Sequence, residues 1–232
     1  MSLTLGLLGG MGPAATVVFL ERLQALTPAR TERDHIRVIA DINPGVPDLT
    51  VPGSGAGPVL AEMAGALRGA GADVLAIACN AAHAHADLIQ RASGLPLIDM
   101  IETASAAAAA SGVRRVGVLG VSRALRLYRE YLAAGAMGMV TLPADRQVEF
   151  TALLDRVRAG DLSTEAQAQM AAAAAELVAD GAEAIIAGCT EITLVMGPEH
   201  VRVELIDPAE HLARRCVDVC LGLEAVPQLL GS

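Results

Sequence analysis

Two cysteines occupy matching positions in two copies of one short sequence. Residues 71–80 read GADVLAIACN and residues 181–190 read GAEAIIAGCT, so that Cys79 and Cys189 each follow an apolar run and precede a small polar residue. A thiol placed between a strand and a helix has its thiolate stabilised by backbone N–H groups. If one such thiol is ionised and the other protonated, one removes a proton from a carbon and the other delivers a proton to the opposite face. This pairing predicts inversion at a stereocentre.

The cysteine stretches belong to a longer internal repeat. Residues 5–9 (LGLLG) resemble residues 116–120 (VGVLG), and residues 96–99 (PLID) resemble residues 204–207 (ELID). The three matches occur in the same order and at nearly the same separation. They indicate two copies of a half-unit of about 110 residues, which is too long for a solenoid repeat.

Each half-unit alternates short apolar runs with helical segments, which indicates parallel βαβ units. A long Pro- and Gly-rich loop is expected over residues 43–57, and loops of that length are usually functional. The Ala-rich runs 106–110 and 171–175 have high helix propensity. The expected strands are 3–8, 37–42, 73–78, 115–119 and 183–187, and the expected helices are 13–26, 58–70, 83–92, 123–134, two that flank Gly160, and 208 to about 223.

The predicted fold class is therefore α/β, with two similar pseudo-symmetric lobes, each a mainly parallel sheet flanked by helices. The N-terminal lobe is expected over residues 1–99 together with 208–228, and the C-terminal lobe over residues 100–207. The last helix has no expected counterpart after Asp99 and is expected to pack back on the first lobe. Because reactive groups gather at the carboxyl ends of parallel strands, we expect Cys79 and Cys189 to face one substrate in a cleft between the lobes.

Composition restricts the possible partners. The chain has 232 residues, of which 53% are hydrophobic and 19% charged, and its formal net charge is −9. A nucleic-acid partner is not expected, because phosphate binding needs a basic surface, although a site for a small anion is compatible with an acidic protein. The sequence starts without a basic secretory n-region and contains no apolar run long enough to span a membrane, so we expect a cytoplasmic protein with no membrane contact.

The remaining two cysteines and the glycine-rich turn have structural interpretations. Cys216 and Cys220 are four residues apart in a late helix with no ligand partner at metal-site spacing, so we expect buried thiols and no metal. A redox disulfide between Cys79 and Cys189 is disfavoured, because redox thiols usually occur as CxxC. The GGMGP turn at residues 9–13 lacks the spacing of nucleotide-binding loops and suits a tight turn beside a small ligand.

The motifs GGMGP (9–13), NPGVPD (43–48), CNAAH (79–83) and GCTE (188–191) resemble the signatures of the PLP-independent aspartate/glutamate racemase superfamily, most closely its aspartate racemase branch. The GCTE motif in place of GCTH speaks against the glutamate racemase branch. The resemblance implies Cys79 and Cys189 as catalytic residues, a small-molecule amino-acid substrate, no cofactor and a homodimer. The function implied is racemisation of aspartate, or of aspartate and glutamate.

The resemblance also assigns residues to the substrate pocket. Asn80 and Thr190 directly follow the cysteines, where their side chains and N–H groups suit an α-carboxylate. Arg158 falls at a position where a basic substrate contact is expected. Asn43 serves either the ligand or the turns of its own loop, and Glu191 either orients a substrate ammonium group or caps a helix. The predicted substrate-binding residues are Met11, Asn43, Asn80, Arg158, Thr190 and Glu191.

Three departures from the family pattern bear on specificity. Leu49 stands where a basic residue is expected, Ala81 replaces a threonine, and residues 121–123 (VSR) replace a Gly-Thr-rich stretch. They leave open a broad-specificity racemase, a racemase of non-acidic amino acids, a maleate isomerase-like enzyme, and a non-catalytic amino-acid binding module. His83 and His85 are interpreted as helix-entry or surface histidines, with a secondary influence of His83 on Cys79 left open.

Overall fold

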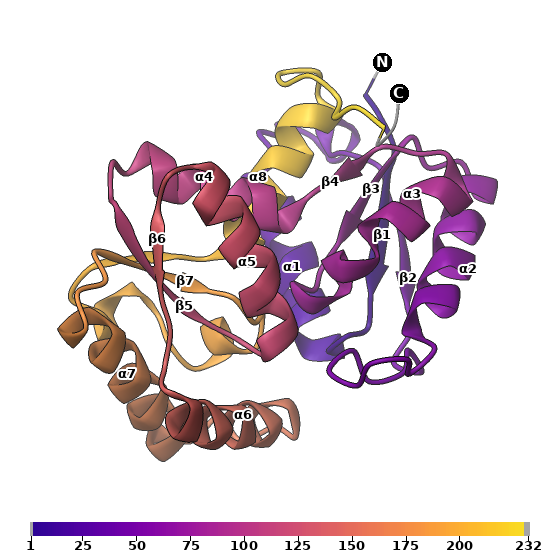
Figure 1. Cartoon of the computed structure of the whole chain (residues 1–232). Helices are drawn as coiled ribbons and strands as arrows, with labels where there is room; N and C mark the ends of the chain where they lie inside the picture. The colour runs from indigo at the N-terminus through magenta and orange to yellow at the C-terminus, as the bar shows by residue number, and fades with distance from the viewer. Residues whose placement is uncertain (1, 230–232) are drawn as a thin grey trace. The chain divides into compact units, whose positions relative to one another are not determined.

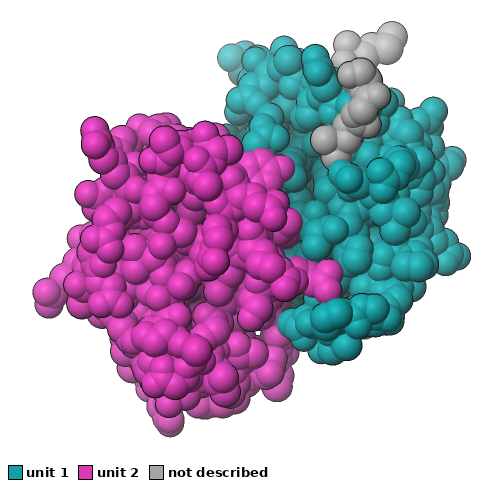
Figure 2. All heavy atoms as spheres, in the orientation of Figure 1, with its two compact units in different colours: residues 1–103, 209–232 teal, residues 104–208 magenta. Residues whose placement is uncertain are grey.

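A computed structural model describes residues 2–229 of the chain. The chain divides into two compact units, shown in different colours in Figure 2. Unit 1 comprises residues 1–103 and 209–232, and unit 2 comprises residues 104–208. Each unit has its own sheet and its own core.

The sheet of unit 1 has four parallel strands in the order β2-β1-β3-β4. Strands β1 and β3 are buried along their whole length, as expected for inner strands of a sheet that helices cover on both faces. The register pairs Leu8 with Ile77, so β1 and β3 end side by side. The strands are β1 (Leu5–Gly9), β2 (Val38–Ile42), β3 (Val74–Ile77) and β4 (Leu97–Ile98).

Helices cover both faces of this sheet (Figure 1). On one face, α1 (Pro13–Leu26) and α8 (Pro208–Cys220) form a core with alternate residues of β1 and β3. On the other face lie α2 (Ala56–Gly69) and α3 (Ala86–Ser93), which pack against each other. Helix α8 thus joins the core of the N-terminal sheet although it lies at the far end of the sequence. The short helices of unit 1 are η1 (Glu32–Asp34) and η2 (Ala81–His85).

The sheet of unit 2 repeats the pattern, with four parallel strands in the order β6-β5-β7-β8. Helix α5 (Ser122–Ala134) packs on β5 and β6, α7 (Thr164–Ala179) packs on β5 and β7, and α6 (Ala144–Arg158) packs on α7. The strands are β5 (Arg115–Leu119), β6 (Gly138–Val140), β7 (Ala184–Ala187) and β8 (Glu204–Ile206), and the short helices are η3 (Ile192–Leu194) and η4 (Pro198–His200).

The expected α/β class and duplicated parallel sheets are confirmed, but three local expectations were wrong. Helix α4 (Met100–Ala110) begins directly after Asp99, so the first half-unit does have a helix at the position that α8 takes after Asp207. The short strands β4, β6 and β8 were not among the expected strands, because two or three residues give too short an apolar pattern to recognise. The segment after Cys79 begins as a 3-10 turn, and the α-helix begins only at Ala86.

Within the described residues, no helix is both long and apolar enough to cross a membrane. The same residues contain no group of three or more His, Cys, Asp or Glu side chains placed to hold a metal ion.

Candidate functional site

The carboxyl edge of the unit 1 sheet brings together the loops that carry the predicted residues of the first half-unit. The Ala78 N–H donates to the Leu8 carbonyl at 3.0 Å, and the Asn43 N–H donates to the Gly9 carbonyl at 3.2 Å. These bonds hold the loops after β1, β2 and β3 against one another. Met11, Asn43, Cys79 and Asn80 therefore lie on loops at one edge of one sheet.

The turn after β1 can be formed only by glycine at Gly10. Its φ is +96°, and a Cβ atom there would lie 2.5 Å from the backbone of Asn43. L-residues with a side chain rarely adopt this conformation, and the contact with Asn43 leaves no room for one. The GGMGP turn thus brings the Gly10 backbone close to the loop that begins at Asn43.

The His83 side chain connects the backbone of Cys79 to the backbone of Met100 through two hydrogen bonds. Its Nδ1 lies 2.8 Å from the Cys79 carbonyl oxygen, and its Nε2 accepts the Met100 N–H at 3.1 Å. A neutral imidazole has one donor and one acceptor nitrogen, so this arrangement assigns the hydrogen to Nδ1. His83 is only 4% exposed and lies in η2, directly before α3, so of the two interpretations given above the surface one was wrong and the helix-entry one is confirmed.

Asp99 also lies near His83 but is engaged elsewhere. Its Oδ1 is 4.0 Å from His83 Nε2 and accepts the N–H groups of Ile101 and Glu102 at the start of α4. The imidazole is therefore used as a neutral bridge between the Cys79 turn and α4. Cys79 itself is 7% exposed at the end of its strand.

The side chains of Asn43 and Leu49, in the long loop, make contacts within unit 1. The Asn43 Oδ1 accepts the Gly45 N–H at 2.9 Å, and its Nδ2 contacts the Met63 sulfur at 3.8 Å. Leu49 is buried. Apolar packing therefore occupies the position at which the family resemblance led us to expect a basic residue. A substrate-binding role for Asn43 stays a prediction.

The carboxyl edge of the unit 2 sheet positions Cys189 through a close backbone approach. Leu119 pairs with Ala187 at the ends of β5 and β7, and a Cβ atom on Gly120 would lie 2.9 Å from the Gly188 carbonyl oxygen. Only glycine at this point lets the two strand ends touch. The turn that follows β5 thus runs beside the residue that precedes Cys189.

Cys189 lies in a compact polar cluster with Glu191 and Arg158. The Cys189 thiol donates to Glu191 Oε2 at 2.8 Å, and Arg158 Nη2 donates to the Cys189 sulfur at 3.4 Å. Arg158 Nε lies 3.9 Å from Glu191 Oε1, and the Thr190 hydroxyl donates to Glu191 Oε2 at 3.3 Å. Arg158 also pairs with Asp155 at 2.8 Å. Three predicted substrate-binding residues of unit 2 therefore surround its predicted catalytic thiol.

The cluster holds a proton and a positive charge beside one sulfur atom. Burial acts to lower the pKa of the Arg158 guanidinium, but the adjacent Cys189 and Glu191 raise the pKa above its ordinary value. The guanidinium therefore stays charged. Because the carboxylate can take the thiol proton while Arg158 faces the sulfur, the cluster can exist as thiol with carboxylate or as thiolate with carboxylic acid.

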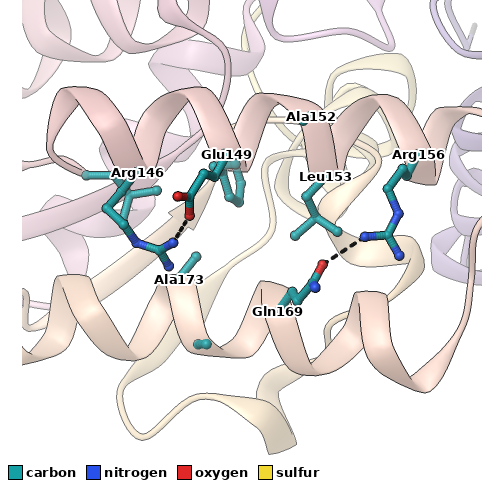
Figure 3. Close-up of a pocket in the computed structure, with 10 residues that line it drawn as sticks. Arg146, Glu149, Ala152, Leu153, Arg156, Gln169 and Ala173 are labelled. Carbon is teal, nitrogen blue, oxygen red and sulfur yellow. Dashed lines mark hydrogen bonds and ion pairs between the residues drawn. The ribbon is translucent and has the colours of Figure 1, made fainter.

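Helix α6 has a second face that does not belong to this cluster. A cavity of about 370 Å³ between α6 and α7 is lined by Arg146, Glu149, Leu153 and Arg156, among others (Figure 3). Arg146 pairs with Glu149, and Arg156 donates to Gln169. None of the predicted site residues lines this cavity. The opposite face of α6 carries Arg158 and Gln147, whose Nε2 donates to the Gly120 carbonyl at 2.9 Å.

Cys216 and Cys220 differ from the two cysteines at the strand ends. Both are buried in the core of unit 1, with exposures of 0% and 1%. Burial raises the pKa of the Cys216 thiol well above its ordinary value and that of Cys220 to about 12. Since the thiolate is the reactive form, these two thiols are unreactive core residues.

The sequence left the role of His83 open and did not point to Gln147. The spacing of four residues between Cys79 and His83 pointed to His83, because a side chain one helical turn later can bond to the Cys79 carbonyl. No sequence pattern pointed to Gln147, because its partner is a backbone carbonyl far away in the sequence.

Replacing His83 with alanine should destabilise the protein. The substitution leaves the buried Cys79 carbonyl and Met100 N–H without their bridge, which costs about 1–3 kcal/mol. Urea unfolding followed by circular dichroism measures the loss, with His211→Ala on α8 as the matched control. An unfolding free energy equal to that of the unsubstituted protein would show that the bridge does not stabilise this turn.

The sequence and the structure of this chain are similar to those of known racemases. The chain is 24% identical over 230 residues to the broad specificity amino-acid racemase RacX of Bacillus subtilis (strain 168), covering 95% of this chain and 100% of that protein. Its structure is similar to that of Picrophilus torridus aspartate racemase, with a TM-score of 0.81 and 22% identity over 94% of each chain.

A second similar structure is that of glutamate racemase from Francisella tularensis in complex with D-glutamate. The TM-score is 0.70 and the identity 17%, covering 96% of this chain and 82% of that one. These likenesses show a shared fold. The sequence pattern of the family described as Asp/Glu/Hydantoin racemase matches residues 8–216, nearly the whole chain with both strand-end cysteines. The chain belongs to the Asp/Glu/Hydantoin racemase family and is an isomerase.

Proposed function

We propose that this protein is a cofactor-independent amino-acid racemase in which Cys79 and Cys189 exchange the α-proton of aspartate, or of aspartate and glutamate. The observation that carries the proposal is the contact of the Cys189 thiol with both Glu191 and Arg158. A thiol with a proton acceptor on one side and a cation on the other is equipped to give and to take a proton. Cys79, at the corresponding strand end of unit 1, supplies the second thiol.

The proposed reaction moves one proton off the α-carbon and another onto it. The thiolate of one cysteine takes the α-proton, so that an S–H bond forms, the C–H bond breaks and the electron pair moves into the substrate carboxylate. The thiol of the second cysteine then donates its proton to the opposite face of the carbon. The product is the mirror-image amino acid, and the two cysteines have exchanged protonation states.

Charge on the substrate carboxylate grows during this reaction and needs donors to stabilise it. Asn80 and Thr190 adjoin the two cysteines and are the proposed donors, and Arg158 adds a positive charge beside Cys189. Met11 lies on the loop after β1 and is proposed to line the substrate pocket. Glu191 is proposed to hold the proton that Cys189 releases, so that the thiolate can form without a new net charge in a buried site.

Substrate preference has a second candidate, a broad-specificity racemase. Leu49 is buried and contributes no charge where a side-chain carboxylate contact was expected. The relative RacX is named for broad specificity. A panel of single amino acids in D₂O decides between acidic and broad specificity by which substrates exchange their α-proton.

A maleate isomerase-like enzyme and a non-catalytic binding module would each give a different result. The isomerase consumes maleate, which is followed by loss of its ultraviolet absorbance. The binding module gives calorimetric binding of an amino acid with no α-proton exchange. We further propose a cytoplasmic location, as expected from the sequence, and a homodimer, as the resemblance implies. Sedimentation at the mass of one chain would contradict the dimer.

Cys79→Ala and Cys189→Ala should each lower racemisation of aspartate by about 100-fold or more, because each removes one of two proton carriers. Each variant should still exchange the α-proton of one enantiomer with D₂O, and the two variants should act on opposite enantiomers. Proton NMR of L- and D-aspartate incubated with each variant measures the exchange. Cys220→Ala, which removes a buried thiol of α8, is the matched control and should keep its activity.

Two results would contradict this assignment. If both variants exchanged the same enantiomer, the cysteines would not address opposite faces of the carbon. If either variant racemised at the rate of the unsubstituted protein, that thiol would have no part in the reaction.

Glu191→Gln should lower kcat by about 10- to 100-fold and make the Cys189 thiolate easier to form. The substitution removes a negative charge and the proton acceptor of the thiol but leaves Arg158 beside the sulfur, so the pKa of Cys189 should fall. The rate of Cys189 alkylation by iodoacetamide as a function of pH, read by peptide mass spectrometry, measures the shift.

Glu130→Gln on the exposed side of α5 is the control for loss of one negative charge. It should change neither kcat nor the pH dependence of alkylation. An unchanged pH profile in Glu191→Gln would show that the carboxylate does not govern the ionisation of Cys189.

A further inference from the structure

Arg123 has no partner in the part of the chain that the structure describes. Its Nε atom is buried without a hydrogen-bond partner, and it forms no ion pair with residues 2–229. The arginines of α6 are different, because Arg146, Arg156 and Arg158 each pair with a carboxylate. A buried guanidinium N–H left without an acceptor is unfavourable. We therefore expect the Arg123 Nε–H group to donate a hydrogen bond to an acceptor that the chain does not supply.

The position of Arg123 in the fold points to the predicted active site. Arg123 lies in the first turn of α5, three residues after Gly120. Gly120 contacts Gly188, the residue before Cys189, so the start of α5 and the Cys189 loop lie side by side at the carboxyl edge of one sheet. An arginine side chain is long enough to reach across this edge. The N-cap residue Val121 has no side-chain cap, so the N–H groups of the first turn add positive potential.

The second cation at this edge, Arg158, is already engaged. It faces the Cys189 sulfur and Glu191 and pairs with Asp155, so its charge is shared among three groups. A dicarboxylic amino acid brings two carboxylates to the site. Its side-chain carboxylate needs a cation that is not committed to the chemistry at the thiol.

We propose that Arg123 binds the side-chain carboxylate of an acidic amino-acid substrate and so determines specificity. The inference rests on the racemase function proposed above. A planar guanidinium suits a carboxylate because it can donate two parallel N–H bonds. The acidic preference then depends on Arg123, while the buried Leu49 contributes no charge to it.

Kinetics of Arg123→Gln, Arg123→Lys and Arg126→Gln test the proposal. Arg126 lies on an exposed part of the same helix and is the matched control. In Arg123→Gln, KM for aspartate should rise about 10-fold or more while kcat/KM for alanine changes less than about 2-fold. Arg123→Lys should recover part of the loss, and Arg126→Gln should match the unsubstituted protein. Equal losses for aspartate and alanine, or no loss for aspartate, would overturn the proposal.

Binding of succinate separates this inference from the racemase function. Succinate carries two carboxylates and no α-proton to exchange, so calorimetry reports recognition even if no amino acid is racemised. Weaker succinate binding in Arg123→Gln, by about 10-fold or more, supports Arg123 as the anchor whatever the activity. Equal succinate binding in the two proteins, or no binding to the unsubstituted protein, overturns it.

Discussion

The hydrogen bond from the Cys189 thiol to Glu191, made beside Arg158, is the interaction on which the proposed chemistry of the chain depends. A thiolate alone in a buried site is unfavourable, and so is a buried carboxylate. Together with one arginine, the pair carries one proton and one net negative charge against one positive charge. The proton can lie on either atom without changing the charge of the cluster, which is what a group that both gives and takes a proton requires. The carboxyl edge of the unit 2 sheet positions Cys189 and Glu191, and the end of α6 supplies Arg158.

The two units share one scaffold but differ in the residues around their strand-end cysteines. The strand orders β2-β1-β3-β4 and β6-β5-β7-β8 are the same, and each places a cysteine after the third strand of its half-unit. Two residues after the cysteine, however, unit 1 has Ala81 and unit 2 has Glu191. Four residues after it, His83 makes a neutral bridge in unit 1. The environments of the two thiols therefore differ, which suits the proposed reaction, in which the two groups start in opposite protonation states.

The sequence predicted the sheets and the strand-end cysteines because both depend on local patterns that repeat. Helix α1 (Pro13–Leu26) and strand β5 (Arg115–Leu119) have the expected bounds, since proline, glycine and apolar runs mark them clearly. The contact of Arg158 with Cys189 joins residues that are far apart in the sequence, and only the family resemblance pointed to it. The partners of His83 and Gln147 are backbone atoms, which no residue pattern identifies. Tertiary contacts of this kind determine the details of the site.

Position in the fold, more than exposure, separates the two thiols proposed to be catalytic from the two thiols of the core. Cys79 and Cys189 are each 7% exposed, and Cys216 and Cys220 are exposed by 0% and 1%. This difference in exposure is small compared with the difference in the groups that surround the sulfur atoms. The α8 thiols are surrounded by the aliphatic core of unit 1, which raises their pKa values, whereas the strand-end thiol of unit 2 faces a guanidinium and a carboxylate. In the proposed reaction, the polar groups around the Cys189 sulfur then govern its ionisation.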